Sequence, residues 1–291
     1  MHSLVKVERG KFTECTHFGH IVISDDSGQI VKAWGNPEEV ILPRSSVKMI
    51  QALPLILSGA ADAYGLSSQE LALSCASHQG AAQHTVAVLS WLENLGLSDL
   101  DLRCGPQLPN DRLSHAALIK KDRSPCQIHN NCSGKHSGFL TLTKHLGAGP
   151  EYIEPDHPVQ KAALEMFEMT TRSTSPGYGI DGCSAPNFAG QLDHIARSMA
   201  WFASSEDRSD SASMAAKRLI DAMRIHPFLV AGEQRACTEL MQAMDGRVAV
   251  KTGAEGVFVA IIPEKKFGIA LKIIDGTSRA SACVLATLLV E

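Results

Sequence analysis

The apolar residues of this chain follow one spacing at its two ends and another in between. Alternating apolar and polar residues fill 17–34 around a turn at 25–28, and the same alternation returns after Gly246 and runs through a second turn at 263–266. A period of two is typical of strands, and such turns join antiparallel neighbours. The two chain ends are therefore expected to share one antiparallel sheet, flanked by an apolar helix from about residue 277.

The long middle of the chain is expected to be mostly helical. The apolar run at 45–57 has helical character, although Pro54 should kink the helix or end it early. A capping box at 67–70 marks another helix start. The polar run at 204–211 is predicted to be a solvated loop. Further stretches with helical spacing are 81–95, 137–146, 159–170, 187–203, 211–223 and 231–244.

These patterns predict an α/β protein of the α+β type, with one domain over residues 1–291. Its sheet would come from about 1–36 and 246–291, and its helical region from about 45–245. A chain of 291 residues that is 44% hydrophobic and 20% charged can bury a sizeable core.

The net charge and the placement of the cysteines limit which binding partners and which cellular location are expected. A net charge of −4 gives no basic field for phosphates, so we expect no nucleic-acid partner. The first residues lack the features of a secretory signal, and no apolar run reaches membrane-spanning length, which predicts a cytoplasmic protein that binds no membrane. The eight cysteines are scattered, which favours reduced thiols, buried packing or metal ligation over a disulfide framework.

Three short motifs carry the candidate chemistry. Ser45 and Lys48 open the first helix, Ser77 begins Ser-His-Gln-Gly, and Lys251 begins Lys-Thr-Gly on a late strand. A serine becomes a nucleophile when a neutral amine removes its proton, and Lys48 lies about one helical turn from Ser45. Burial and a second cation favour the neutral amine, and Lys251 is suited to be that cation. Taken alone, Ser45 and Lys48 also suit an N-cap and a solvated helix lysine.

The order of these motifs resembles that of the penicillin-recognising serine hydrolases, which carry Ser-x-x-Lys on a helix, Ser-x-Asn on a loop and Lys-Thr-Gly on a strand. Here Ser77-His78-Gln79 replaces Ser-x-Asn, so the chain is not predicted to be a β-lactamase. Seven blocks over nearly the whole chain resemble the asparaginase II family of Rhizobium type more closely. They are His17-Phe18-Gly19-His20, Pro43 to Lys48, Gln51-Ala52-Leu53-Pro54, Ser77-His78-Gln79-Gly80, Asn131 to His136, Asp181 to Pro186 and Lys251 to Gly256.

This resemblance implies an L-asparagine amidohydrolase with a β-lactamase-like fold, which forms a homodimer. It also implies two serine/lysine pairs at the active site. On this sequence the pairs are Ser45 with Lys48, and Ser77 with Lys251.

The resemblance further implies a zinc ion held by two cysteines and a lysine, which the blocks place at Cys132, Lys135 and Cys183. Cysteine thiolates suit zinc, and Gly134 lets the backbone turn tightly around an ion. A lysine must lose its proton to coordinate a metal, and the residues by themselves favour His136 with the two cysteines.

The predicted reaction is acyl transfer in two steps. Ser45 attacks the side-chain carboxamide with Lys48 as its base, ammonia leaves, and water hydrolyses the aspartyl ester. Ser77 and Lys251 would relay a proton to the leaving ammonia, although the two serines could exchange roles. Backbone amides at the helix start are expected to bind the oxyanion. The residues expected to contact the substrate are Arg44 for the α-carboxylate, Asp181 for the α-ammonium, and His136.

Two alternatives to this prediction stay open. One is a glutaminase, or a β-lactam or peptide hydrolase that uses the same serine/lysine apparatus. The other is a non-catalytic protein that binds zinc or an amino acid with the same fold. The presence of all four residues, Ser45, Lys48, Ser77 and Lys251, argues against the second alternative.

Overall fold

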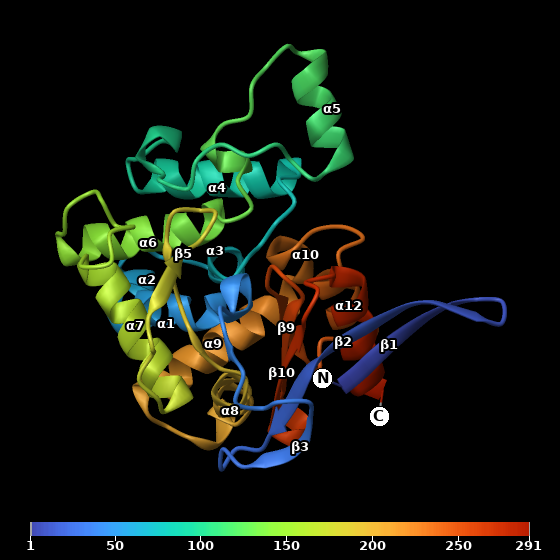
Figure 1. Cartoon of the computed structure of the whole chain (residues 1–291). Helices are drawn as coiled ribbons and strands as arrows, with labels where there is room; N and C mark the ends of the chain where they lie inside the picture. The colour runs from blue at the N-terminus through green and yellow to red at the C-terminus, as the bar shows by residue number, and fades with distance from the viewer. Residues whose placement is uncertain (1, 291) are drawn as a thin grey trace.

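A six-stranded antiparallel sheet takes its strands from both ends of the chain in the computed structural model, which describes residues 2–290 (Figure 1). The strand order is β1-β2-β10-β9-β8, and β3 also pairs with β2. The two chain ends meet where Ile21 lies opposite Leu271. The predicted fold class is thereby confirmed; residues 1 and 291 of the predicted domain lie outside the described residues. The strands are β1 (His2–Arg9), β2 (Phe12–Ser24), β3 (Ile30–Trp34), β8 (Ala249–Thr252), β9 (Val257–Ile262) and β10 (Phe267–Ile273).

Helices cover both faces of this sheet. Helix α8 (Leu192–Ala203) lies against β2, β9 and β10, while α12 (Ser278–Val290) lies against β1, β9 and β10. Strand β9 is accordingly apolar and buried along nearly its whole length, because its side chains meet a helix on either side. Gly268 in β10 permits this close packing, since a Cβ at that position would overlap the backbone nitrogen of Ala200.

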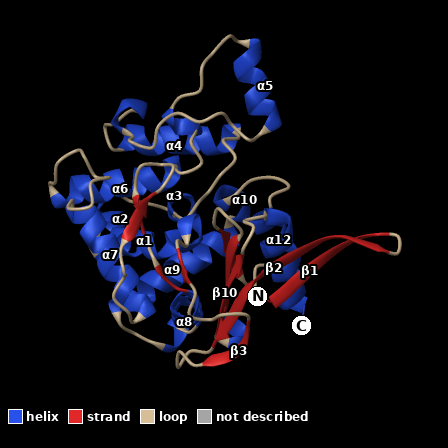
Figure 2. Cartoon of the chain, viewed as in Figure 1, coloured by secondary structure: helices blue, strands red, loops and turns tan. Residues whose placement is uncertain are grey.

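The residues between the two halves of the sheet form the helical region (Figure 2). Its centre is α1 (Lys48–Leu57), which is buried from Lys48 to Ile56 and packs against α6, α7 and α9. The capping box of Ser67 and Glu70 starts α3, as predicted. The other helices are α2 (Ala60–Ala63), α3 (Ser68–Ser74), α4 (Ala82–Asn94), α5 (Arg112–Lys120), α6 (Ser133–Leu146), α7 (Pro158–Thr171), α9 (Ser211–Ile225), α10 (Pro227–Val230) and α11 (Ala236–Ala243).

Several boundaries differ from the sequence-based expectation. The 3-10 turn η1 (Arg44–Val47) precedes α1, and α1 continues through Pro54 to Leu57. Burial of nearly every α1 side chain compensates for the backbone hydrogen bond that Pro54 cannot donate. The polar run expected to be a solvated loop contains the 3-10 turn η4 (Ser205–Asp207), and its first two residues, Ser204 and Ser205, are buried.

Two small sheets interrupt the region predicted to be mostly helical. The expected helix at 187–203 begins only at Leu192, because the residues before it pair as strands. Strand pairing, with residues 178–180 nearby in the chain and with the distant residues 40–41, outweighs the local helical spacing there. The strands are β4 (Val40–Ile41) with β7 (Gly190–Gln191), and β5 (Tyr178–Ile180) with β6 (Pro186–Phe188).

Two elements extend away from the rest of the molecule in Figure 1. One is the ribbon formed by β1 and the first half of β2, and the other is α5, none of whose residues is buried. No helix within residues 2–290 is long and apolar enough to cross a membrane.

Candidate active site

Two lysine amines meet at one serine hydroxyl where the sheet borders the helical region. Ser77 follows α3, Lys48 is the first residue of α1, and Lys251 lies on the edge strand β8. Lys251 Nζ lies 2.8 Å from Ser77 Oγ, and Lys48 Nζ lies 3.1 Å from the same oxygen. All three residues are buried. Segments that are far apart in the chain thus form one compact group.

Backbone contacts hold this group in place. The Ser77 amide donates to the carbonyl of Val230 (2.9 Å), and Lys48 Nζ also donates to the carbonyl of Ala76. Lys251 Nζ donates to the carbonyl of Thr252 at 2.8 Å. The Ser77 hydroxyl is therefore fixed between two amines that are themselves anchored.

The charge state of Lys251 is set by its surroundings. Burial, with the nearby charge of Lys48, lowers the pKa of Lys251 to about 7. The sequence-based expectation assigned the neutral amine to Lys48 and the cation to Lys251. The structure instead provides a ready base at Lys251, because this amine is partly neutral near pH 7.

Ser45 lies apart from this hydrogen-bonded group. It is the second residue of η1 and is half-buried, and its hydroxyl has no hydrogen-bond partner within residues 2–290. The α-helix begins only at Lys48, so Ser45 is not one α-helical turn before that lysine. Lys48 contacts Ser77 rather than Ser45, and the nucleophilic role of Ser45 stays a prediction.

A second group of side chains adjoins the first. Cys132 occupies the N-cap position of α6, Lys135 lies in the first turn of α6, and Cys183 lies in the loop between β5 and β6. Lys135 Nζ is 3.1 Å from Cys183 Sγ, and Lys48 Nζ is 3.1 Å from Cys132 Sγ. All of these side chains are buried. Lys48 therefore connects the two groups.

The thiols of this group differ in acidity. A hydrogen bond from Cys132, together with the charge of Lys135, lowers the pKa of Cys183 well below its usual value. The same hydrogen bond, together with burial, raises the pKa of Cys132 to about 12. Against the effect of burial, the charges of the two cysteines raise the pKa of Lys135. One thiolate and one ammonium thus face each other in the interior.

These residues fit a zinc ion in donor chemistry. Cysteine sulfurs are preferred zinc ligands, and the amine of Lys135 can coordinate after losing its proton. Among residues 2–290, no three His, Cys, Asp or Glu side chains form a metal-binding group, so any zinc site here depends on the lysine. The structure brings Cys132, Lys135 and Cys183 close together, and their binding of zinc stays a prediction.

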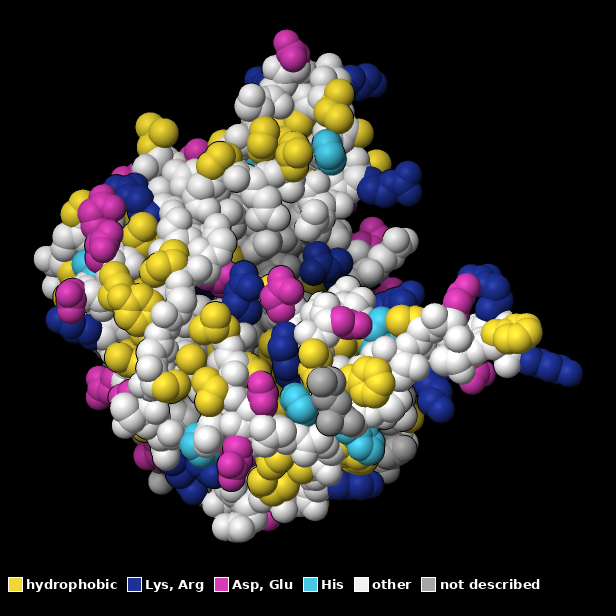
Figure 3. Space-filling view, in the orientation of Figure 1, with side chains coloured by type: hydrophobic (Ala, Val, Ile, Leu, Met, Phe, Trp, Pro, Cys, Tyr) yellow, Lys and Arg dark blue, Asp and Glu magenta, His cyan; other side chains and the backbone are white. Residues whose placement is uncertain are grey.

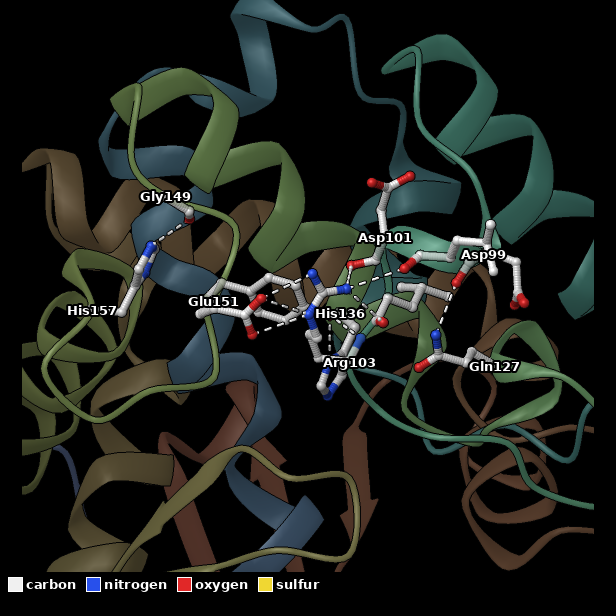
Figure 4. A network of polar contacts seen from close by, with 11 residues as sticks. Asp99, Asp101, Arg103, Gln127, His136, Gly149, Glu151 and His157 are labelled. Carbon is white, nitrogen blue, oxygen red and sulfur yellow. Dashed lines mark hydrogen bonds and ion pairs between the residues drawn. The ribbon is translucent and has the colours of Figure 1, made fainter.

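His136 contacts a tyrosine in the interior. Its Nδ1 lies 2.9 Å from the hydroxyl of Tyr152, which also accepts a hydrogen bond from the Arg103 amide. Figure 4 shows His136 beside Arg103, whose guanidinium pairs with Glu151. Burial lowers the pKa of His136 well below its usual value, so the ring is neutral. The structure thus places His136 in the interior.

Arg44 and Asp181 pair with each other. Arg44 Nε and Nη2 lie 2.9 and 2.7 Å from the same oxygen of Asp181. Partial burial raises the pKa of Asp181, but the charges of Lys135 and Arg44 outweigh burial and lower this pKa. The two residues predicted to bind opposite ends of the substrate therefore neutralise one another.

His78 is a residue whose role the sequence did not reveal. Its Nε2 lies 2.9 Å from Ser133 Oγ, and its Nδ1 accepts a hydrogen bond from the Gly80 amide. Ser133 directly follows Cys132, so His78 joins the Ser77 loop to the thiol group. Its position inside Ser-His-Gln-Gly was the available signal.

The sheet is built from both chain ends, and a helical region borders it. A serine lies between two lysines where the two meet. This arrangement defines a protein of the β-lactamase-like fold class. Solved structures agree with this fold. A β-lactamase candidate from Bacteroides dorei has a TM-score of 0.51 at 11% identity, with 94% of this chain and 93% of that chain covered. No curated protein sequence matched the chain.

The chain belongs to the L-asparaginase II family, whose model matches residues 5–291. The structures of Mglu are also similar in fold: its tris and glutamate form has a TM-score of 0.53 at 13% identity over 93% of this chain, and its native form has a TM-score of 0.50 at 14% identity over 94%. The chain spans 58% and 63% of those two Mglu chains, respectively.

Proposed function

We propose that this protein hydrolyses L-asparagine to L-aspartate and ammonia through an acyl-enzyme on a serine. The observation that carries the proposal is Ser77 Oγ, held 2.8 Å from Lys251 Nζ and 3.1 Å from Lys48 Nζ. A hydroxyl between two amines can pass a proton from one to the other. Family membership supplies the substrate, and the amines supply the proton transfer that amide hydrolysis requires.

In this proposal Ser45 is the nucleophile. Its half-buried hydroxyl has no hydrogen-bond partner in the described chain and is more open to a substrate than Ser77, which is 8% exposed. Ser45 Oγ attacks the side-chain carbonyl carbon, and its proton passes to the neutral amine of Lys251. Ser77 then delivers its proton to the departing nitrogen and takes up the proton of Lys251 in its place, so that the carbon–nitrogen bond breaks, ammonia leaves and the amine is neutral again. Water hydrolyses the resulting ester and releases aspartate.

Cys132, Lys135 and Cys183 are proposed to hold a zinc ion, which when bound supplies a positive charge that can hold or polarise the substrate. Lys48 contacts both Cys132 and Ser77, so the position of its amine depends on the thiol group. The homodimer that the family resemblance implies remains a prediction.

Ammonia release from L-asparagine tests the reaction. Ser45→Ala and Ser77→Ala should each lower kcat by at least about 10³-fold, because residues that act as one catalytic unit fail together. Ser90→Ala, at an exposed position on α4, is the matched control and should retain activity. L-glutamine and a chromogenic β-lactam serve as competing substrates, and both should be turned over more slowly.

Mass spectrometry of acid-quenched enzyme identifies the nucleophile. An aspartyl adduct on the peptide that carries Ser45 supports the proposal, whereas an adduct on the Ser77 peptide exchanges the two roles. Undiminished ammonia release from both alanine variants would overturn serine catalysis. Absence of turnover on every substrate would favour the non-catalytic binding protein.

A further inference from the structure

A cavity of about 460 Å³ opens at Arg44, the residue that precedes Ser45. Its charged lining residues are Glu39, Arg44, Glu255 and Lys272. Figure 3 shows positive and negative side chains gathered in the middle of the face that Figure 1 presents. A hollow lined by both signs of charge suits a small zwitterion better than an apolar ligand or a simple anion.

The cavity is joined to the catalytic motifs through the chain. Arg44 directly precedes Ser45, and Glu255 lies in the turn that follows β8 and its Lys-Thr-Gly motif. The end of β8 lies against η1, because a Cβ at Gly253 would be 2.5 Å from the carbonyl oxygen of Pro43. A ligand in this cavity therefore lies next to the segment that carries Ser45.

Two of the charges in the cavity are available to a ligand. Arg44 is already paired with Asp181, but Lys272 Nζ donates only to the backbone carbonyl of Glu255 and has no carboxylate within 4.0 Å in residues 2–290. The carboxylate of Glu255 likewise makes no ion pair or hydrogen bond in this part of the chain. An amine and a carboxylate that line one cavity without pairing can each take a group of opposite charge.

The backbone at this cavity is strained. Arg44 has φ 54° and Glu255 has φ 56°, both in the left-handed region that residues with a Cβ disfavour. Such conformations persist where the surrounding structure enforces them, and they cluster at ligand-binding sites. The surrounding structure therefore holds Arg44 and Glu255 in these conformations at the cavity wall.

We propose that this cavity binds the α-amino-acid end of the substrate, with Glu255 facing the α-ammonium and Lys272 facing the α-carboxylate. The assignment rests on the proposed function, because it leaves the amide end of the same molecule at Ser45. Arg44 and Asp181, whose charges neutralise each other, then form part of the surrounding wall rather than the two receptors.

Truncated substrates test each charge separately. The probes are L-asparagine, succinamic acid, which lacks the α-ammonium, and 3-aminopropanamide, which lacks the α-carboxylate. Glu255→Gln should lower kcat/KM about 10- to 100-fold for L-asparagine and 3-aminopropanamide, through a higher KM, but not for succinamic acid. Lys272→Met should lower kcat/KM for L-asparagine and succinamic acid, but not for 3-aminopropanamide.

Glu264→Gln and Lys265→Met are the matched controls, because both residues are exposed on the turn η5 (Pro263–Lys265) and lie outside the cavity. Their kinetic constants should equal those of the wild type for all three substrates. Equal losses on all three substrates in Glu255→Gln, or no loss, would overturn the assignment while leaving asparagine hydrolysis intact.

Calorimetric titration of Ser45→Ala with L-asparagine separates this proposal from the proposed function. Binding that weakens when Glu255→Gln or Lys272→Met is added supports the cavity, even if the wild type releases no ammonia. Binding of unchanged affinity in these double variants overturns the cavity assignment, whatever the wild type does in the ammonia assay.

Discussion

Two lysine amines and one serine hydroxyl share the interior between α1, α3 and β8. Like charges that close together disfavour each other, and burial disfavours both. Lowering the pKa of Lys251 to about 7 relieves this conflict, because the amine can shed its proton near neutral pH. A side chain that is normally cationic thereby becomes a base.

The pH dependence of activity should report this amine. We expect kcat/KM to rise about tenfold per unit below pH 7 and to level off above it, because only the neutral form of Lys251 accepts a proton. In Lys251→Arg the guanidinium stays protonated, so activity should be low and the rise near pH 7 absent. A rate assay from acid to mild alkali checks this. Identical profiles in wild type and variant would contradict it.

At the scale of the element, the position of the site depends on close helix packing. Gly134 brings α6 against α3, where a Cβ would overlap the carbonyl of Leu73, and this approach places Cys132 near Ser77. Gly268 does the same for α8 on the sheet. Both contacts are made by backbone atoms, so movements of side chains cannot relieve the overlap that an added methyl group would cause.

Gly268→Ala should therefore destabilise the protein. We expect a loss of about 3 kcal/mol in the free energy of unfolding, since the added Cβ forces α8 away from β10. Gly149→Ala is the control, because nothing lies within 4 Å of a Cβ there, and it should change stability by less than about 0.5 kcal/mol. Urea denaturation measures both. Equal effects of the two substitutions would refute this account.

At the scale of the whole molecule, the thiol group links two distant parts of the helical region. Cys132 directly precedes α6, and Cys183 lies in the β5–β6 loop. A metal that binds both segments in the folded protein, and not in the unfolded chain, stabilises the folded state. The proposed zinc ion should thus contribute to stability as well as to substrate binding.

Metal removal tests this link. At a free zinc concentration of about 100 times Kd, binding adds about 2.7 kcal/mol, so a chelator should lower Tm by several degrees. Cys183→Ser should abolish the chelator effect and the bound zinc measured by mass spectrometry. Cys283→Ser, an exposed thiol on α12, should keep both. Wild-type protein without bound metal, or with a Tm that a chelator leaves unchanged, would argue against the site.

The local sequence determined the types of most elements and the identity of the candidate chemistry. The alternating ends predicted the sheet, the capping box predicted the start of α3, and the ordered motifs pointed to Lys48, Ser77 and Lys251, which lie near one another. These features depend on residues close together in the chain, where spacing and propensity act directly.

Only the tertiary structure decided which side chains meet. Spacing placed Lys48 beside Ser45, but packing turned its amine toward Ser77 and Cys132. Spacing offered Arg44 and Asp181 as separate receptors, yet they pair with each other, and strand pairing replaced the start of the helix expected at 187–203. The Lys48–Cys132 and Arg44–Asp181 contacts join residues 84 and 137 positions apart. They follow from the burial and electrostatics of the whole molecule, which no local pattern records.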